Sequence, residues 1–268
     1  AGSPAAGSPP VVALDSAVLA PRVAEAFDAS AGGWPQAAVH SPDLMIAARD
    51  LDALAVAHVI ERVHGGAVAG HRALATEPAL ELAMTRATSE KRRIGHAAAA
   101  MVSRDQSVLM DAGSTTTAVA RALLARDDLS GVVVFTNSLT IAFEFERGEQ
   151  QFTVGVTGGT VRHKQHSLVD PLGDMFMGLI RGDICFIGCN GVSAEGVTNS
   201  SMPEVIMKKR FMESSRKRVL VADSTKIGRT QLARVAPLSA IDLLITGVET
   251  PEVNLEPIRE AGVAIQQV

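Results

Sequence analysis

One turn of this chain combines the residue types that bind anions at the start of a helix. An apolar run predicts the end of a buried strand, and Asp111-Ala-Gly-Ser-Thr-Thr116 follows it and begins a helix. Gly113 permits backbone conformations that other residues resist, and Ser114 is a typical N-cap. Free N–H groups at a helix N-terminus favour an anion, and the Ser114, Thr115 and Thr116 hydroxyls add donors. The turn therefore predicts a phosphate or carboxylate site, an ordinary capped turn being the alternative.

Polar turn residues also follow most of the other strands that the sequence predicts. Because the carboxyl ends of parallel strands meet at one edge of a sheet, we expect these turns to line a shared ligand crevice. Glycine, asparagine and serine are the usual residues of any turn, so unrelated turns are the alternative. Besides the first turn, the residues expected in the crevice are Thr136, Asn137, Gly158, Gly159, Asn190, Gly191 and Lys226.

The expected crevice contains few groups that could catalyse a reaction. It has two acids, Asp111 and Asp223, and one cation, Lys226. His163 and His166 lie in a loop, where they could close over a ligand or form part of a solvated charged run. The sequence shows no metal-ligand cluster and no Gly-x-Gly-x-x-Gly after a strand, so we expect no metal, no cofactor and no catalytic residue.

The elements that must position these turns form a repeating pattern. Seven short apolar runs alternate, for the most part, with stretches long enough for a helix. Such strands are typical of a mainly parallel sheet with helices on both faces, which places the chain in the α/β class. The predicted strands are residues 107–110, 132–135, 152–156, 184–187, 218–222, 243–245 and 263–266.

Two of the predicted helices have bounds that the structure can test. One is predicted over residues 90–102. Another is predicted over residues 203–217, with Pro203 at its start and basic residues at its end. Glu204 with Lys208, and Glu213 with Lys217, would then form pairs four residues apart on this second helix.

Residues 1–70 have a different character. The first ten are a low-complexity tail rich in Ala, Gly, Ser and Pro. Two helices are expected, near residues 18–29 and from Ser41 onward, and apolar pairs around Gly65-Gly66 fit a small β-wing. We expect a small, mostly helical domain in residues 1–70 and the α/β domain in residues 71–268.

Composition limits the class of protein further. The chain has 268 residues, of which 47% are apolar and 20% charged, as in globular proteins. It has no apolar run near the ~18 residues of a membrane span. Cys185 and Cys189, about 13 Å apart along a strand, are too distant for a disulfide, so a reduced cytoplasmic protein is expected. Residues 1–70 carry three basic and seven acidic side chains, which accounts for the net charge of −4.

Several motifs, in their order and spacing, resemble the DeoR-type family of bacterial sugar-operon repressors from about Ile46 to the C-terminus. The matching stretches are Arg49-Asp-Leu-Asp-Ala-Leu54, Ile60-Glu-Arg-Val-His-Gly-Gly-Ala67, Glu90-Lys-Arg-Arg-Ile-Gly95, Asp111-Ala-Gly-Ser-Thr-Thr116, Thr136-Asn-Ser138, Thr157-Gly-Gly159 and Ala222-Asp-Ser-Thr-Lys226. The resemblance implies an N-terminal winged helix-turn-helix that binds operator DNA. It also implies an effector domain with the fold of ribose-phosphate isomerases, glucosamine-phosphate deaminases and CoA transferases.

The resemblance further implies a phosphorylated sugar or related metabolite as effector. Its phosphate would lie on the turn from Ser114 to Thr116. In the N-terminal domain the chain departs from the family pattern, since Met45-Ile-Ala-Ala-Arg-Asp-Leu51 has apolar residues at two positions that usually face DNA. The remaining candidates for DNA phosphate contacts are Ser41, Arg49 and Arg62.

The sequence therefore favours a repressor controlled by a phosphorylated sugar and acting as a homo-oligomer on two half-sites. One alternative is a sugar-phosphate isomerase or deaminase, with Asp111 or Asp223 as general base and Lys226 stabilising the oxyanion. Another is an effector-binding protein that has lost DNA binding, which the departure at Ala47-Ala48 suggests.

Overall fold

The computed structural model describes residues 60–63, 66–69, 77–148, 151–169 and 172–268. The chain divides into two compact units, Ala1–Ala73 and Leu74–Val268. In the first unit, β1 (Ile60–Val63) pairs antiparallel with β2 (Gly66–Ala69), as expected for a small wing. The two expected helices, with Ser41 and Arg49, lie outside the described residues. The boundary near residue 70 stays a prediction.

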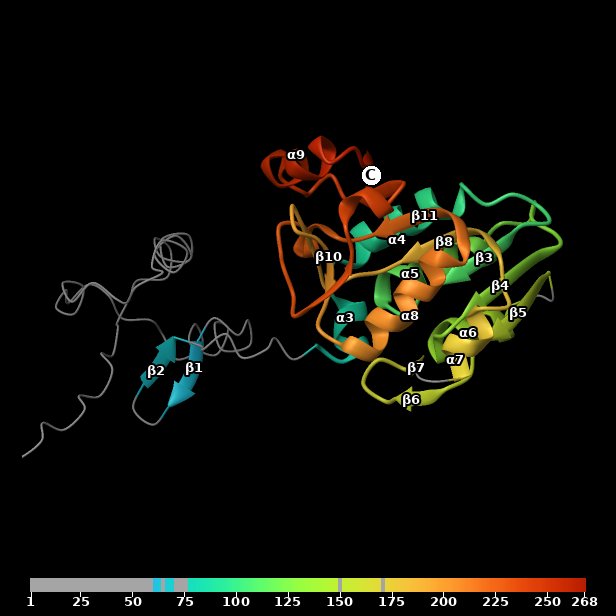
Figure 1. Cartoon of the computed structure of the whole chain (residues 1–268), viewed down its shortest axis with the longest axis horizontal. Coiled ribbons are helices and arrows are strands. Elements are labelled where there is room, and N and C mark those ends of the chain that lie inside the picture. Colours follow the sequence, from blue (N-terminus) through green and yellow to red (C-terminus); the bar gives the residue numbers. More distant parts are fainter. Residues whose placement is uncertain (1–59, 64–65, 70–76, 149–150, 170–171) are drawn as a thin grey trace, which may run out of the picture. The chain divides into compact units, whose positions relative to one another are not determined.

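The second unit is built on a sheet of seven parallel strands in the order β14-β13-β11-β8-β3-β4-β5 (Figure 1). This confirms the predicted α/β class, and each predicted strand is present. The strands are β3 (Ser107–Met110), β4 (Val132–Thr136), β5 (Phe152–Val156), β8 (Gly182–Ile187), β11 (Ser215–Val221), β13 (Leu243–Thr246) and β14 (Ala264–Gln267).

Burial on both faces explains the near-continuous apolar strands. Val108 and Met110 point to one face of β3 and Leu109 to the other, as the two-residue repeat of a strand requires, and all three are fully buried. Helices α4 (Thr88–Ala99), α5 (Ser114–Leu124) and α6 (Leu139–Glu146) cover the first face. Helices α7 (Leu172–Met177), α8 (Met202–Glu213) and α9 (Glu252–Glu260) cover the second.

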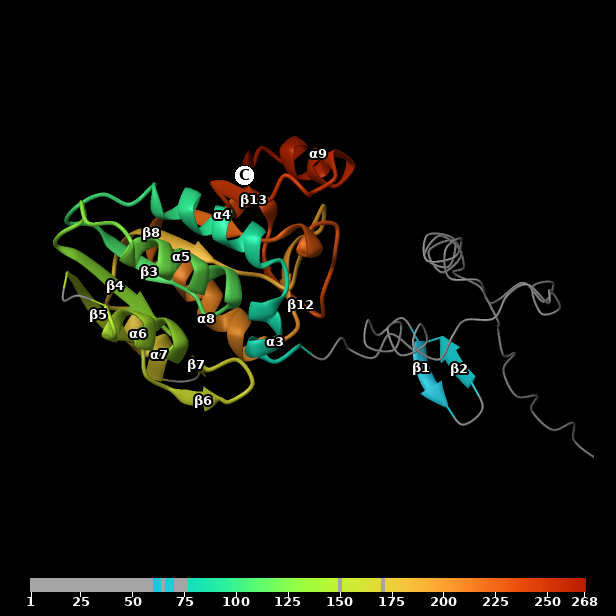
Figure 2. The same cartoon turned by 180° about the vertical axis from the view of Figure 1, so that it is seen from behind.

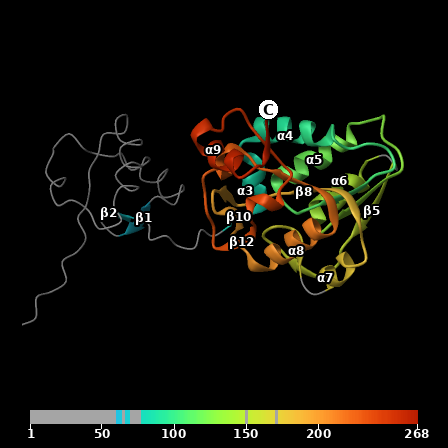
Figure 3. The ribbon, with the colours of Figure 1, turned by 45° about the horizontal axis from the view of Figure 1, so that its top comes forward.

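The pictures show these layers directly. The view in Figure 1 has α7 and α8 in front, and the view from behind in Figure 2 has α4 and α5 in front. Figure 3 shows the two helical layers on opposite sides of β8 and β5. Helices α4 and α5 pack closely at Gly95, where an added Cβ would lie 2.5 Å from the carbonyl oxygen of Ala118.

The predicted end of the helix over residues 203–217 is wrong. Helix α8 ends at Glu213, and β11 begins at Ser215. Ser215 and Lys217 lie in register with Gly182 and with Ile184 of β8, so sheet pairing overrides the helical signal of the basic residues. Glu213 and Lys217 therefore do not share a helix. The helix predicted over residues 90–102 is present as α4, which begins two residues earlier and ends at Ala99.

Smaller elements surround the carboxyl ends of the strands. A hairpin of β6 (Thr160–Arg162) and β7 (Ser167–Val169) follows β5. A second, antiparallel sheet consists of β9 (Gly191–Ser193), β10 (Gly196–Asn199) and β12 (Ala233–Ala236). A 3₁₀ turn, η2 (Ser224–Lys226), lies at this edge after β11, and a second, η3 (Leu238–Ala240), precedes β13. None of these small elements was predicted from the sequence.

A short helix, α3 (Leu80–Thr85), precedes α4. Ala87 joins the two helices with a φ of 48°, in the left-handed region. The Lys91 Nζ of α4 donates hydrogen bonds to the carbonyls of Ala83 and Arg86, at 2.7 and 2.8 Å, and so holds the end of α3. Among the helices described, none is both long enough and apolar enough to span a membrane.

Candidate functional site

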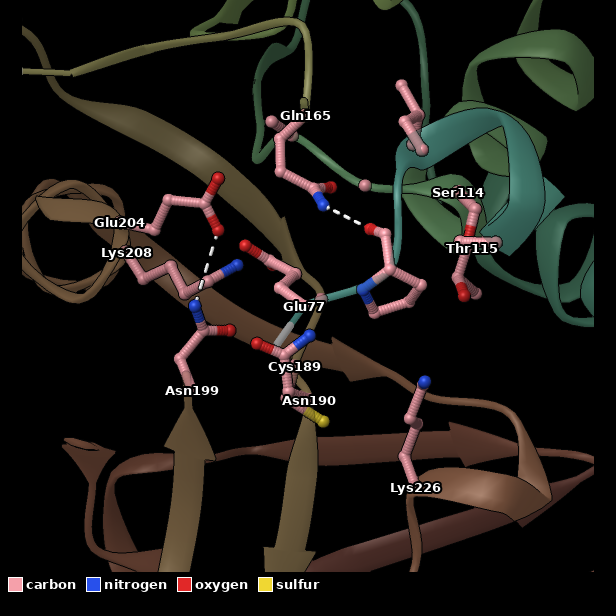
Figure 4. A pocket seen from close by; sticks show the side chains of 16 residues that line it. Glu77, Ser114, Thr115, Gln165, Cys189, Asn190, Asn199, Glu204, Lys208 and Lys226 are labelled. Carbon is pink, nitrogen blue, oxygen red and sulfur yellow. Dashed lines mark hydrogen bonds between the residues drawn. The ribbon is translucent and has the colours of Figure 1, made fainter. Parts of the chain in front are cut away.

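A pocket lies at the carboxyl ends of β3, β8 and β11, and we call it the strand-end pocket (Figure 4). Strands β3 and β8 are the point at which the strand order reverses, since the chain proceeds from β3 to β4 on one side and from β8 to β11 on the other. Such switch points are where α/β sheets bind ligands. The residues that line the strand-end pocket are Glu77, Pro78, Leu80, Ala83, Ala112, Gly113, Ser114, Thr115, Gln165, Gly188, Cys189, Asn190, Asn199, Glu204, Lys208 and Lys226.

One side of the strand-end pocket is formed by the N-terminus of α5. The helix begins at Ser114, and Gly113 is its N-cap. The expected capping role of Ser114 is therefore wrong, because no side chain caps this helix. The Thr116 and Thr117 hydroxyls donate to the Gly113 carbonyl at 3.0 and 2.7 Å, whereas Ser114 and Thr115 line the pocket. The first N–H groups of a helix have no intrahelical acceptor, so this side favours an anion.

Lys226 adds a positive charge on the same side. It lies in η2, directly after β11, and Figure 4 shows its ammonium group on the side of Ser114 and Thr115. Asp223 caps this 3₁₀ turn by accepting from the Thr225 N–H at 3.1 Å. The turn thus fixes the backbone from which Lys226 extends.

A buried ion pair lies beneath the pocket. Lys208 of α8 pairs with Asp111 at the end of β3, and their side chains are 2% and 1% exposed. The Gly188 N–H also donates to Asp111, at 3.1 Å. The other carboxylate oxygen, Oδ1, is buried without a hydrogen-bond partner among the described residues. Burial raises the pKa of Asp111 to about 6, and the Lys208 charge opposes this rise.

A second charged group lies on the side opposite Lys226. Arg162 of β6 pairs with Glu204 of α8 and donates to Glu77 at 2.9 Å. Glu204 also accepts from the Ser167 hydroxyl at 2.9 Å and from the Asn199 amide at 3.3 Å. Burial, and then the charge of Glu204, raise the pKa of Glu77 above its usual value.

These groups were missed by sequence reasoning. They reach the pocket from the segment before α3, from α8 and from the small elements around it, and they are Glu77, Gln165, Asn199, Glu204 and Lys208. Glu204 and Lys208 were noted only as a pair four residues apart on a helix. That spacing was the available signal, because it places both side chains on one face of α8.

Some predicted ligand residues support the first turn instead of lining the pocket. The Thr136 hydroxyl donates to the Met110 carbonyl at 2.7 Å. Asn137 accepts from the Ala112 N–H at 2.9 Å and donates to the Leu168 carbonyl at 3.1 Å. Both side chains are fully buried, so they position the turn that leads into α5.

Of the predicted set, the structure brings Gly113, Ser114, Thr115, Asn190 and Lys226 together in the lining, with Asp111 directly beneath. Thr116, Thr136, Asn137, Gly158, Gly159 and Gly191 are not part of it. At Gly191 an added Cβ would lie 2.5 Å from the carbonyl oxygen of Arg229, which explains the glycine by packing. Arg62 lies in β1 of the other unit.

The histidines considered as a lid do not line the pocket either. His166 Nε2 lies 3.0 Å from a Glu81 oxygen, and its Nδ1 lies 3.2 Å from the Thr140 hydroxyl. These contacts join the β6–β7 hairpin to α3 and α6. His163 is likewise outside the lining.

The acids that could act as general bases are already engaged. Asp111 pairs with Lys208, and Asp223 lies 3.5 Å from Lys91 and caps η2. Burial raises the pKa of the Cys189 thiol, which lines the pocket, to about 12. Across the described ranges, no three His, Cys, Asp or Glu side chains gather as a metal site would require. The geometry suits binding of an anion more than proton transfer.

Comparison with known proteins identifies a matching family model and several sequence relatives. The model of the DeoR C terminal sensor domain matches residues 86–248. The HTH-type transcriptional regulator GlpR of Haloferax volcanii is 36% identical over 218 residues, which cover 81% of this chain and 83% of the relative. GolR of Listeria innocua is 30% identical over 81% of this chain and 84% of its own.

Two further similarities are more distant. The glycerol-3-phosphate regulon repressor of Escherichia coli is 29% identical over 76% of this chain and 79% of its own. The solved structure of a ribose 5-phosphate isomerase of Methanocaldococcus jannaschii aligns with 51% of this chain over 52% of the length of the isomerase chain. The sequence identity is 16% and the TM-score is 0.38. That last similarity is too low to carry an argument, so the expected relation to the isomerases stays a prediction. On the family model and the sequence relatives, this chain belongs to the DeoR family of transcriptional regulators.

Proposed function

We propose that this chain is a repressor whose binding to operator DNA is controlled by a phosphorylated sugar or related metabolite in the strand-end pocket. The proposal rests on one observation, which is that the α5 N-terminus and Lys226 line the same side of that pocket. Unpaired helix N–H groups and a lysine together bind a phosphate well. The family membership supplies the link to transcription, since the relatives are regulators and repressors by name.

The proposed control follows from differential binding. An effector changes DNA affinity only if it binds one arrangement of the protein better than another. Ser41, Arg49 and Arg62 are the proposed contacts to DNA phosphates, and a homo-oligomer would place two such units on two half-sites. A binding role, rather than turnover of a sugar phosphate, is supported by the engagement of Asp111 and Asp223 in ion pairs.

The test is a thermal-shift titration of the full chain with sugar phosphates and their unphosphorylated parents. A ligand that binds only the folded state adds about 2.7 kcal/mol at a hundred times its Kd. We expect a shift with a phosphorylated sugar, no shift with its parent, and loss of the shift in Ser114→Ala/Thr115→Ala. The same ligand should change the affinity of the chain for DNA from its own promoter region.

The control variant is Ser193→Ala/Thr230→Ala, which removes one serine and one threonine hydroxyl that bond each other at 2.9 Å outside the pocket. It should retain the shift. If no phosphorylated compound shifts the wild-type chain, the proposed effector class is wrong. If a compound shifts it without any change in DNA affinity, the proposed control is wrong.

A further inference from the structure

The strand-end pocket has opposite charges at its two sides. Ser114, Thr115 and Lys226 form the positive side described above. At the other side, Figure 4 shows Glu77 with its carboxylate directed toward Glu204 and Lys208. The charged group there contains three carboxylates and two cations, which belong to Glu77, Glu204, Asp111, Arg162 and Lys208. With all five ionised, this side carries an excess of negative charge.

The two cations at this side already have partners. Lys208 pairs with Asp111 and is 2% exposed. Arg162 uses one terminal nitrogen for Glu204 and the other for Oε2 of Glu77, at 2.9 Å. Arg162 is also absent from the pocket lining. A ligand that approaches this side therefore meets cations whose charge is offset by carboxylates.

Glu77 is the acidic group that an occupant would meet first. Its side chain is 11% exposed, against 4% for Glu204 and 2% for Lys208, and all three line the pocket. The backbone around it is fixed, because the Gln165 amide donates to the Pro78 carbonyl at 2.6 Å. The Leu80 N–H also donates to the Lys164 carbonyl, at 3.0 Å. The Glu77 carboxylate is thus a hydrogen-bond acceptor that extends from a fixed backbone at the pocket wall.

We propose that Glu77 is the specificity-determining residue of the pocket, and that it selects phosphorylated effectors whose far end donates hydrogen bonds, such as a hydroxyl or an ammonium group. An effector whose far end is a carboxylate or a second phosphate is rejected, because like charges placed together cost binding free energy. This inference rests on the proposed function, since it assumes that the phosphate lies at α5.

The experiment uses matched pairs of ligands that differ only at the end remote from the phosphate. D-Glucitol 6-phosphate and 6-phosphogluconate share six carbons, and glycerol 3-phosphate and 3-phosphoglycerate share three. Affinities of the full chain are measured by calorimetry, with inorganic phosphate as a further probe. We expect the hydroxyl-terminated member of at least one pair to bind roughly tenfold tighter or more, which corresponds to about 1.4 kcal/mol.

The variants separate recognition from a structural role. Glu77→Gln keeps an acceptor for Arg162 and removes the negative charge, so the affinity ratio within the pair should fall several-fold. The control Glu81→Gln makes the same change on an exposed residue of α3 outside the lining, and it should leave the ratio unchanged. A structural role for Glu77 would instead lower both affinities equally, and that result would overturn the inference.

The affinities of the wild-type chain alone also test the inference. If both members of every pair bind equally, or the carboxylate member binds tighter, the inference is wrong while the phosphate site stands. If neither the pairs nor inorganic phosphate bind, the proposed function fails as well. The two failures are therefore distinguishable without any variant.

Discussion

At the scale of single residues, the buried pair of Asp111 and Lys208 connects a helix to the end of a central strand. Both side chains are almost fully buried, and Asp111 also accepts the Gly188 N–H. The pair therefore joins the ends of β3 and β8 to α8, directly beneath the strand-end pocket. Removing one partner of such a pair leaves a buried charge without compensation, which costs far more than the pair itself contributes.

A double-mutant cycle tests this. We expect Lys208→Met, which leaves the Asp111 carboxylate buried without its cation, to lower the free energy of unfolding by about 3–5 kcal/mol. Asp111→Asn should change it much less, because burial already disfavours the Asp111 charge, and the double variant should lose less than the sum of the two. Urea denaturation measures all four proteins. Arg259→Met, which breaks only exposed contacts of α9, is the control and should have a much smaller effect. Additive losses would show that the two groups do not interact.

The raised pKa of Asp111 predicts a pH dependence of stability. Burial moves this pKa from its ordinary value of 3.8 to about 6. Between these values the folded chain holds a proton that the unfolded chain releases, so acidification favours the folded state. Relative to the Asp111→Asn/Lys208→Met variant, in which neither group titrates, the wild type should gain stability as the pH falls from 7 to 4. Urea denaturation at several pH values measures the difference, and a difference that is constant or decreases contradicts the assignment.

At the scale of elements, the joint between α3 and α4 depends on Ala87. Its φ of 48° is a conformation that costs an alanine about 1–2 kcal/mol and a glycine almost nothing. Ala87→Gly should therefore raise the free energy of unfolding by about 0.5–1 kcal/mol, after the greater flexibility of glycine in the unfolded chain is subtracted. Ala97→Gly, inside α4, is the matched control and should lower it by about 1 kcal/mol. Equal losses in both variants, by thermal or urea denaturation, would exclude the strain at Ala87.

The elements that the sequence predicts well are those whose signal is local. Apolar strands such as β3 were located because burial on both faces leaves no polar positions within them. The end of α8 was misplaced because Arg216 and Lys217 resemble a helix terminus, while their pairing with β8 depends on distant residues. The three-residue strands of the β6–β7 hairpin are too short for a period to be recognised.

The residues of the candidate site also divide into those with a local sequence signal and those without one. The turn around Gly113 and Ser114 was predictable, because strand, turn and helix follow one another in the chain. Glu77 and Asn199 were not, because only the packing of α3 and β10 at the strand ends brings them to the pocket. Thr136 and Asn137 were assigned to the ligand since turn residues that bind ligands and turn residues that hold other turns have the same chemistry.

At the scale of the whole molecule, two neighbouring residues of α4 hold three parts of the sensor domain. Glu90 accepts from the N–H groups of Ser224 and Gly247, at 2.6 and 3.1 Å, and so ties α4 to the turns after β11 and β13. Lys91 holds the end of α3 and lies 3.5 Å from Asp223. The turn that carries Lys226 and the helix that follows Glu77 are therefore connected through one turn of α4.

The lining of the strand-end pocket comes from positions as far apart in the chain as Glu77 and Lys226. A molecule that contacts both would act on the polypeptide as a reversible cross-link, closing a long loop that contains most of the central strands. Opening of α3 or η2 would then require the occupant to leave, so local fluctuations of the two segments become correlated. The metabolite would in this sense set the cooperativity of the domain, independently of any change in its average shape.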